Sequence, residues 1–273
     1  MSSSPTLLLR SGRSIPQLGL GVWQAPAGAT TRDAVANALR LGYRHIDTAR
    51  IYQNEADVGA AIKDCGIPRE QIFVTTKLWN DDHGHDKALR AFDASAKRLG
   101  LDYIDLYLVH WPVPRLRIES WRALEELHAA KRARSIGVSN YLVPHLEELL
   151  AVASHPPDAN QIELSPFLQR RDTVALCAKE KIVVEAYSPL TRGKRLGHPV
   201  IKTIAGELGK SAAQVLLKWG VQHGFVVLPK SVREARIAEN GSIWDFTLSV
   251  DQLARLDALE ENLATGWDPS EQD

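Results

Sequence analysis

The chain has 273 residues, of which 44% are hydrophobic and 24% are charged, and this composition is sufficient for a large buried core. Its 33 basic and 33 acidic side chains cancel to a formal net charge of zero, which argues against a nucleic-acid-binding or membrane-surface protein. No apolar run approaches the ~20 residues of a membrane-spanning helix. The N-terminus has no basic segment followed by an apolar stretch, so a secretory leader is not expected.

The two cysteines, Cys65 and Cys177, lie in different amphipathic segments. This pattern fits small buried thiols in a reducing compartment better than a disulfide. We therefore expect a cytoplasmic protein. Nothing in the sequence requires a second subunit, so a monomer is expected.

Short apolar runs alternate with helix-length amphipathic segments along the chain. A hairpin is expected first, with residues 7–9 and Ile15 on either side of a turn at 11–13. The candidate strands that follow are residues 18–23, 44–47, 73–77, 104–110, 135–139, 160–163, 183–187 and 225–228. Between them, apolar residues recur at helical spacing, as at Leu89, Phe92, Ala96 and Leu99.

Eight strand–helix alternations in a chain of this length predict an α/β fold of the (β/α)8 TIM barrel type. No linker or repeat divides the chain, so residues 1–273 are expected to form a single barrel domain with a short N-terminal hairpin. Residues 112–117 and 188–199 are expected to be short loops over the barrel mouth. A doubly wound sheet is the alternative, but its glycine-rich turn has only Gly19-Leu20-Gly21, followed by Gln24 where a third small residue is needed.

Three consecutive predicted strands end on reactive side chains. They are Asp47, Lys77 and His110, and Tyr52 follows shortly after the first of them. Because alternate residues of a strand share a face, Lys77 and His110 continue the inward rows of their strands. The active sites of these barrels form at the carboxyl ends of the strands, so we expect the four side chains to meet there.

These residue types suit proton transfer to or from a carbonyl oxygen. A free phenol has a pKa of ~10, and a nearby Lys77 ammonium would lower the pKa of Tyr52. Asp47 can pair with Lys77, and His110 can donate to a carbonyl oxygen or orient it. Taken singly, each has a structural explanation, such as a helix cap for Asp47 or a core histidine for His110.

Longer motifs around these residues resemble the aldo-keto reductase family. They are Gly-Tyr-Arg-His-Ile-Asp-Thr-Ala at 42–49, Thr-Lys-Leu-Trp at 76–79, Leu-Tyr-Leu-Val-His-Trp-Pro at 106–112, Ser-Ile-Gly-Val-Ser-Asn at 135–140, Ala-Tyr-Ser-Pro-Leu at 186–190 and Leu-Pro-Lys-Ser-Val at 228–232. The resemblance runs from about residue 15 to residue 259. The short loops are similar to those of bacterial members that include 2,5-diketo-gluconate reductases.

The resemblance implies an NADP-dependent oxidoreductase of carbonyl and CH–OH groups that reduces small aldehydes, ketones and keto-sugars with NADPH. Tyr52 would be the general acid, Lys77 and Asp47 would tune it, and His110 would orient the substrate. The implied cofactor contacts at the nicotinamide side are Ser139, Asn140, Gln161 and Tyr187, and those at the adenosine side are Lys230, Ser231, Arg236, Glu239 and Asn240. Ser188, Leu190 and Val232 are further implied contacts of the cofactor. Lys230, Ser231 and Arg236 would bind the 2′-phosphate, which favours NADPH over NADH.

Three tryptophans, Trp23, Trp79 and Trp111, are expected to wall the substrate pocket, although core packing is an alternative for each.

Arg50 and Gln53 depart from the family pattern, and the simplest interpretation of Arg50 is a solvent-facing side chain. The stretch Asp-Asp-His-Gly-His-Asp at 81–86 is expected to be a solvated loop and helix cap, and no metal is expected. The alternative function is a cofactor-binding regulatory or redox-sensing barrel with little turnover.

Overall fold

The computed structural model describes residues 4–271, so Met1, Ser2 and Ser3 of the N-terminal segment considered above lie outside the described residues. The strands are β1 (Thr6–Leu8), β2 (Ser14–Pro16), β3 (Leu20–Gly21), β4 (His45–Asp47), β5 (Phe73–Leu78), β6 (Ile104–Val109), β7 (Ala133–Ser139), β8 (Ala159–Glu163), β9 (Val183–Tyr187) and β10 (Val226–Leu228). The α-helices are α1 (Ala29–Arg40), α2 (Glu55–Asp64), α3 (His85–Leu99), α4 (Arg117–Ala129), α5 (Val143–Leu150), α6 (Arg171–Lys179), α7 (Pro199–Leu208), α8 (Ala212–Gln222), α9 (Glu234–Gly241) and α10 (Val250–Asp257). Short 3-10 turns lie at η1 (Arg50–Tyr52), η2 (Arg69–Gln71), η3 (Asn80–Asp82), η4 (Thr191–Gly193) and η5 (Pro269–Glu271).

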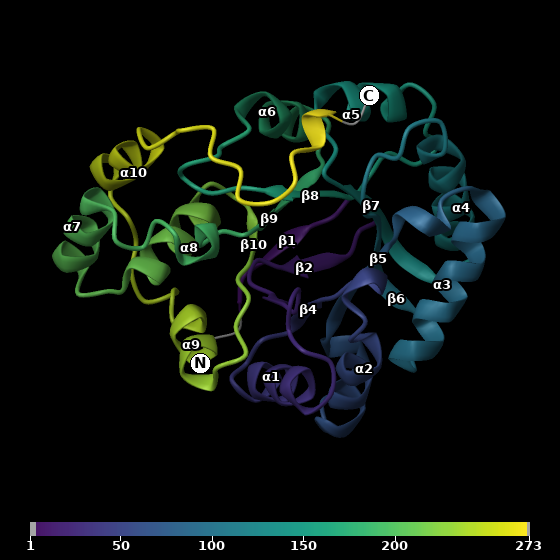
Figure 1. The fold of residues 1–273 in the computed structure, drawn as a ribbon, viewed down its shortest axis with the longest axis horizontal. Coiled ribbons are helices and arrows are strands. Elements are labelled where there is room, and N and C mark those ends of the chain that lie inside the picture. The colour runs from purple at the N-terminus through teal and green to yellow at the C-terminus, as the bar shows by residue number, and fades with distance from the viewer. Residues whose placement is uncertain (1–3, 272–273) are drawn as a thin grey trace.

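Strands β3 to β10 form a parallel sheet in which each strand pairs with its neighbour in the sequence. Parallel bridges from Leu18 to Val227 and from Gly21 to Lys230 join the first and last strands. A backbone hydrogen bond of 3.1 Å from Gly21 N to Pro229 O strengthens this closure. The predicted (β/α)8 barrel is therefore confirmed, and Figure 1 shows the helices arranged around the strands.

The predicted strands and the hairpin are present, with small differences at their ends. The first barrel strand is reduced to β3, because the residues around it bond to the last strand as isolated bridges. The mouth loops lie where expected: α4 begins at Arg117 and α7 begins at Pro199. None of the helices in the described range is long and apolar enough to cross a membrane.

The two ends of the barrel interior differ in chemistry. At one end the antiparallel hairpin β1–β2 inserts Leu9 and Ile15 into a cluster with Leu106, Leu108 and Val226 from the strands. A larger cluster fills the layer between the strands and the surrounding helices. Because the hairpin side is filled by apolar side chains, the polar inward residues gather at the other end of the barrel, where the strands terminate.

One close contact depends on a residue without a side chain. Gly59 of α2 lies against the end of α3, where an added Cβ would come within 2.1 Å of the Leu99 carbonyl oxygen. Gly206 of α7 differs, because a Cβ added there would meet no atom within 4 Å. Two helical glycines thus differ in whether neighbouring backbone excludes a side chain.

We expect Gly59→Ala to lower the free energy of unfolding by about 1–3 kcal/mol, because α2 and α3 must separate to admit the methyl group. Gly206→Ala is the matched control and should raise it by roughly 0.5–1 kcal/mol, as alanine favours the helix. Urea unfolding followed by circular dichroism measures both. Equal effects of the two substitutions would contradict the packing argument.

Candidate active site

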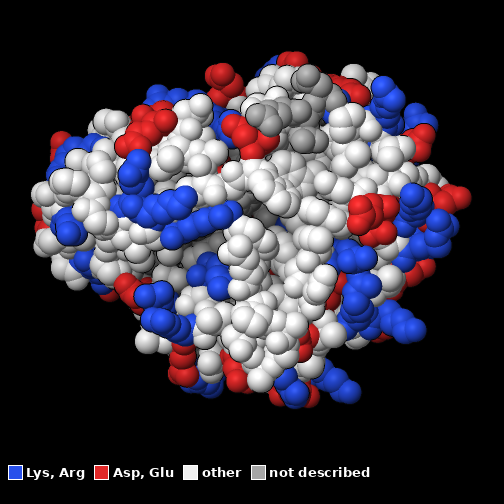
Figure 2. All heavy atoms as spheres, viewed as in Figure 1, with Lys and Arg blue, Asp and Glu red and all other residues white. Residues whose placement is uncertain are grey.

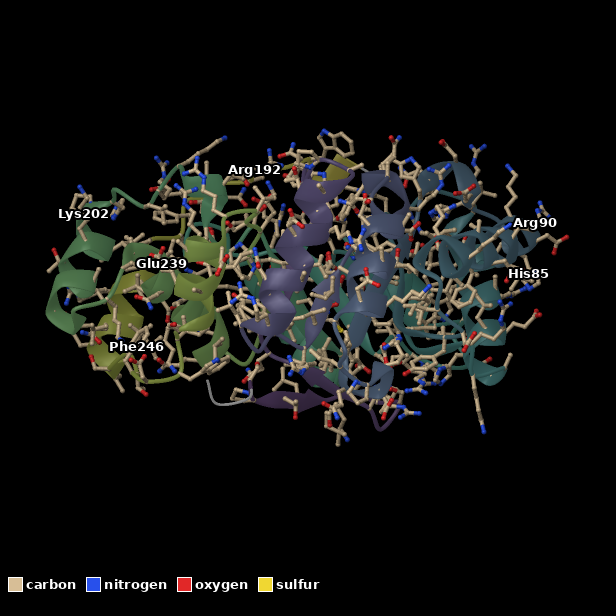
Figure 3. The ribbon with its side chains drawn as sticks, turned by 90° about the horizontal axis from the view of Figure 1, so that it is seen from below. His85, Arg90, Arg192, Lys202, Glu239 and Phe246 are labelled. Carbon is tan, nitrogen blue, oxygen red and sulfur yellow. The ribbon has the colours of Figure 1, made fainter. Side chains whose placement is uncertain are left out.

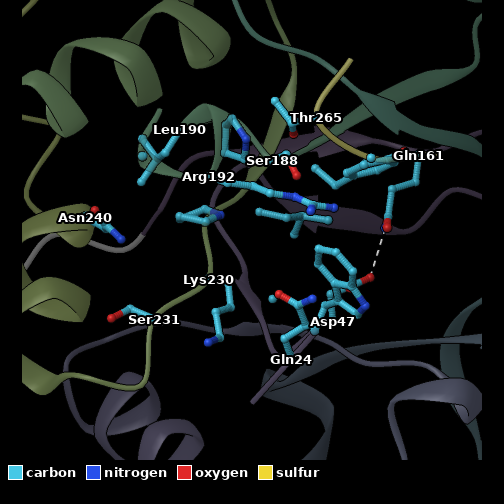
Figure 4. A pocket seen from close by; sticks show the side chains of 18 of the residues that line it. Gln24, Asp47, Gln161, Ser188, Leu190, Arg192, Lys230, Ser231, Asn240 and Thr265 are labelled. Atoms are coloured by element: carbon cyan, nitrogen blue, oxygen red, sulfur yellow. Dashed lines mark hydrogen bonds between the residues drawn. The ribbon is translucent and has the colours of Figure 1, made fainter. Parts of the chain in front are cut away.

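A cavity of about 1080 Å³ opens at the carboxyl ends of the strands. Asp47 ends β4, Gln161 lies in β8, and Lys230 follows β10, and all three line this cavity. Figure 4 shows Asp47 and Gln161 on one side, Leu190 and Asn240 on the other, and Lys230 between them. The cavity is large enough to hold a dinucleotide together with a small substrate.

A buried ion pair forms the floor of the cavity. The Lys77 ammonium donates to both carboxylate oxygens of Asp47, at 2.7 and 2.8 Å, and to the Thr48 carbonyl oxygen at 2.9 Å. Burial by itself would lower the pKa of Lys77, but the negative charge of Asp47 and the neighbouring Tyr52 outweigh it and raise that pKa. Lys77 therefore keeps its positive charge although its side chain is fully buried.

Tyr52 lies directly above this pair. Its hydroxyl oxygen is 3.4 Å from Lys77 Nζ, which also lies 5.0 Å from the ring centroid. Burial raises the pKa of Tyr52, and the attraction of Lys77 offsets only part of that rise. Lys77 thus lowers the pKa of Tyr52 as expected, but burial outweighs this effect, and the sequence could not show how completely the phenol is buried.

The loop that carries Tyr52 is held by a buried amide. Asn54 is fully buried, and its side chain accepts from the Thr48 hydroxyl at 2.8 Å and donates to the Val22 carbonyl at 3.0 Å. Gln53 has φ 57°, in the left-handed region that glycine adopts with least strain. Gln53 therefore carries backbone strain that a glycine at this position would avoid.

His110 packs edge-on against two rings, with centroid distances of 5.8 Å to Tyr52 and 5.3 Å to Trp79. Burial, followed by the charge of Lys77, lowers the pKa of His110 well below its usual range. The imidazole is therefore neutral near pH 7 and can donate one hydrogen bond. Its Nδ1 atom has no hydrogen-bond partner among residues 4–271.

A polar network extends from the ion pair across the cavity wall. The Gln161 side-chain amide donates to Asp47 at 2.9 Å, and the Ser139 hydroxyl donates to the main-chain carbonyl of Gln161 at 2.8 Å. Asn140, with φ 64°, donates to the His110 carbonyl at 2.9 Å and accepts from the Tyr187 hydroxyl at 2.8 Å. The structure thus brings the predicted nicotinamide-side residues into one connected set next to the predicted catalytic residues.

The other end of the cavity is positively charged. Lys230, Ser231 and Arg236 line it near the N-terminus of α9, together with Glu239 and Asn240. Partial burial lowers the pKa of Lys230. Figure 2 shows Lys and Arg side chains gathered along one side of a central hollow on this face.

Two predicted site residues are not on the cavity wall. Val232 packs against the hydrophobic core instead, so its predicted cofactor contact is not among the wall residues. Lys77 lies beneath the wall and reaches the cavity only through Tyr52 and Asp47. The remaining predicted residues line the cavity, including Ser188, Leu190 and the tryptophans Trp23, Trp79 and Trp111.

The structure adds cavity residues that the sequence analysis missed. The segment Thr265, Gly266 and Trp267 lines the cavity, and Figure 1 shows this yellow end of the chain passing in front of the barrel strands. Glu163, at the end of β8, accepts from Thr265 N at 2.9 Å and from Gly266 N at 3.0 Å. This segment has no helical or strand periodicity. The only signal for it in the sequence was an aromatic residue, Trp267, near the end of the chain.

Arg192 is a second addition. It lies in η4, where its guanidinium packs 4.4 Å from the centroid of the Trp23 ring. Figure 4 shows its side chain extended across the cavity. The loop after β9 and the loop after β3 therefore meet above the cavity floor.

The stretch from Asp81 to Asp86 does not behave as a solvated loop throughout. His83 is buried and its Nδ1 lies 3.0 Å from the Ser120 hydroxyl, which corrects the expectation for this residue. Figure 3 shows His85 and Arg90 at the outer edge of the molecule. Between residues 4 and 271, no group of three or more His, Cys, Asp or Glu side chains is placed to hold a metal ion.

Arg50 faces Asp82 at 3.6 Å and is not on the cavity wall.

Comparisons with known proteins place the chain in a family. Residues 17–261 match the model of the aldo/keto reductase family. The chain is 45% identical over 270 residues to a glyoxal reductase of Bacillus subtilis, covering 99% of this chain and 98% of that protein. It is 44% identical over 274 residues to a methylglyoxal reductase of Escherichia coli, covering 98% of each. A solved aldo-keto reductase of Bombyx mori in complex with NADP superimposes with a TM-score of 0.93 at 35% identity, over 100% of this chain and 98% of that one.

Proposed function

Because this chain belongs to the aldo/keto reductase family, we propose that it reduces the carbonyl group of small aldehydes and ketones, keto-sugars included, with NADPH. The observation that carries the proposal is the buried Asp47–Lys77 pair with the Tyr52 hydroxyl 3.4 Å from the ammonium, at the floor of a cavity that can hold a dinucleotide. When bound, NADPH supplies the hydride. The protein then has to supply the proton and the geometry.

Tyr52 is proposed as the general acid. Its phenol keeps its proton near pH 7, because burial raises its pKa, and the adjacent Lys77 charge stabilises the phenolate that forms when the proton leaves. Asp47 holds that ammonium in place with two hydrogen bonds. The neutral His110 imidazole can donate to the substrate carbonyl oxygen and orient it towards the Tyr52 hydroxyl.

The cofactor is proposed to lie along the whole cavity. Ser139, Asn140 and Gln161 would face its carboxamide and Tyr187 its ring, because these four already form one fixed network on the wall.

The adenosine end of the cofactor would lie at the positively charged end of the cavity. The cations Lys230 and Arg236, with Ser231, would bind the adenosine 2′-phosphate, and Glu239 and Asn240 would lie near the adenine. Ser188 and Leu190 would contact the cofactor between these ends.

Small carbonyl compounds fit the aromatic end of the cavity. Trp79 and Trp111 wall it beside His110, and Trp267 lies 5.9 Å from Trp111 between ring centroids. The names of the Bacillus and Escherichia relatives point to short dicarbonyl compounds, which we include in the proposed substrate class. Trp267 is 71% exposed, so the wall that it forms depends on the anchoring of its segment by Glu163.

We further propose a monomer that works in the cytoplasm. The cavity and its proposed catalytic groups all come from one chain. Both Cys65 and Cys177 are free thiols, as suits a reducing compartment. The reverse reaction, oxidation of a CH–OH group with NADP⁺, uses the same groups with Tyr52 as the base.

The first test replaces Tyr52 with phenylalanine, which removes the proton donor and leaves the ring. We expect kcat for NADPH-dependent reduction of methylglyoxal to fall by about 10²–10⁴-fold, with NADPH affinity within about twofold of wild type. Loss of NADPH absorbance gives kcat, and fluorescence titration gives affinity. Wild-type NADPH binding without turnover on any carbonyl tested would favour the regulatory alternative instead.

The second test reverses the charge of Arg236. Arg236→Glu should raise KM for NADPH by about 10²-fold or more while changing KM for NADH by less than about threefold, because NADH has no 2′-phosphate. Arg233→Glu is the matched control, since Arg233 lies off the cavity wall in the same segment. Equal changes for both cofactors would exclude a phosphate contact at Arg236.

The third test concerns the C-terminal wall of the cavity. We expect Trp267→Ala to raise KM for an aromatic aldehyde by about fivefold to tenfold, because a ring–ring contact of about 1 kcal/mol is lost. Glu163→Gln should act in the same direction, since its amide nitrogen cannot accept a backbone N–H. A short aliphatic aldehyde serves as the control substrate and should change little. If KM changed equally for both aldehydes, Trp267 would not be a wall of the substrate site.

A further inference from the structure

An acidic side chain that the proposed reaction does not use lies inside the barrel below the catalytic pair. Glu185 of β9 is fully buried, and it pairs in register with Gln161 of β8 and Val226 of β10. Neither of its carboxyl oxygens has a hydrogen-bond partner within the described part of the chain. His45 of β4 faces it, with the imidazole Nε2 3.9 Å from Glu185 Oε2.

The charged and titratable groups around Glu185 come from two neighbouring regions of the barrel. Strand β4 contributes His45 and Asp47, and β5 contributes Lys77, while Gln161 and Val226 on the flanking strands are neutral. The only positive charge among these groups, on Lys77, is already taken up by Asp47. An ionised Glu185 would therefore be a second carboxylate competing for one ammonium.

An unpaired buried carboxylate is costly, so such a group keeps its proton. Burial, and then the negative charge of Asp47, raise the pKa of Glu185 to about 8. Burial lowers the pKa of His45 to about 4, so this imidazole is neutral near pH 7. At neutral pH the barrel interior thus holds one compensated ion pair and two uncharged groups.

We propose that Glu185 is a positioning residue of the reaction, which holds a proton beneath the Asp47–Lys77 pair and so adds no second negative charge that would weaken the attraction of the Lys77 ammonium for the Tyr52 phenolate. This inference rests on the proposed function, since it concerns the acidity of the proposed proton donor. When Glu185 loses its proton, a second negative charge beside Lys77 weakens the stabilisation of the Tyr52 phenolate. Tyr52 then becomes a weaker acid, and reduction slows as the pH rises above about 8.

The test compares Glu185→Gln, which resembles the protonated carboxyl, with wild type. Reduction of methylglyoxal at saturating NADPH is followed from about pH 6 to about pH 10, and cofactor deuterated at the transferred position establishes that the chemical step limits the rate. Below pH 7 the two kcat values should agree within about twofold. By about pH 9 wild type should lose about threefold to tenfold of its kcat, whereas the variant should keep most of it.

Two further variants separate charge from structure. Glu185→Leu also lacks the titrating group, so its alkaline decline should move to higher pH as in Glu185→Gln. Glu207→Gln removes a carboxylate at the surface of α7 and should follow wild type at every pH. Alkaline profiles of wild type and both Glu185 variants that superimpose, after each is scaled to its own neutral value, would overturn the proposal.

A stability measurement tests the buried proton without using activity. Since the pKa of Glu185 is raised on folding, its contribution to stability is full below about pH 4.5 and is lost as the pH rises towards about 8. The ratio of the folding equilibrium constant of Glu185→Gln to that of wild type should therefore rise by up to about tenfold per pH unit across this range, and then level off. A ratio that stays constant with pH would overturn the proposal even in an active enzyme. Absence of turnover in wild type, with the pH-dependent ratio present, would instead refute the proposed function.

Discussion

The buried ion pair between Lys77 and Asp47 is the interaction on which the rest of the site depends. Burying an ammonium is tolerable only when each of its N–H donors meets an acceptor. The two Asp47 oxygens and the Thr48 carbonyl provide three acceptors at 2.7 to 2.9 Å, so the charge is held at one position. That position is within 3.4 Å of the Tyr52 hydroxyl, and the geometry of the proposed proton donor follows from it.

Closure of the barrel produces this arrangement by dividing its interior into two chemical regions. The hairpin fills one end with apolar side chains such as Leu9 and Ile15, which excludes water from below. Towards the other end the inward positions become polar, beginning with His45 and Glu185 and ending at the cavity. A low-dielectric base beneath the site strengthens every electrostatic interaction above it. The same base makes any uncompensated charge costly, which is why Glu185 keeps a proton.

The cavity combines a rigid floor with walls contributed by loops. Its floor is built on strand ends and joined by the network from Asp47 through Gln161 to Asn140 and Tyr187. Its walls include segments from distant parts of the sequence, such as the loop carrying Arg192 and the C-terminal segment tied down by Glu163. The proposed chemistry is thus set by the strand ends of the barrel, and the loops can change the substrate without moving the proposed proton donor.

The barrel, its strands and most of the residues at the cavity could be predicted from the sequence, because strand alternation and short local motifs carry that information. The sequence could place Asp47, Lys77 and His110 at the ends of successive strands, since backbone periodicity alone fixes such positions. How deeply each group is buried follows from the folding of the whole chain, and so does the rise in the pKa of Tyr52 although Lys77 is beside it. The tertiary structure also decided that Trp267, near the end of the chain, faces the cavity. Both depend on contacts between residues far apart in the chain, which no local pattern records.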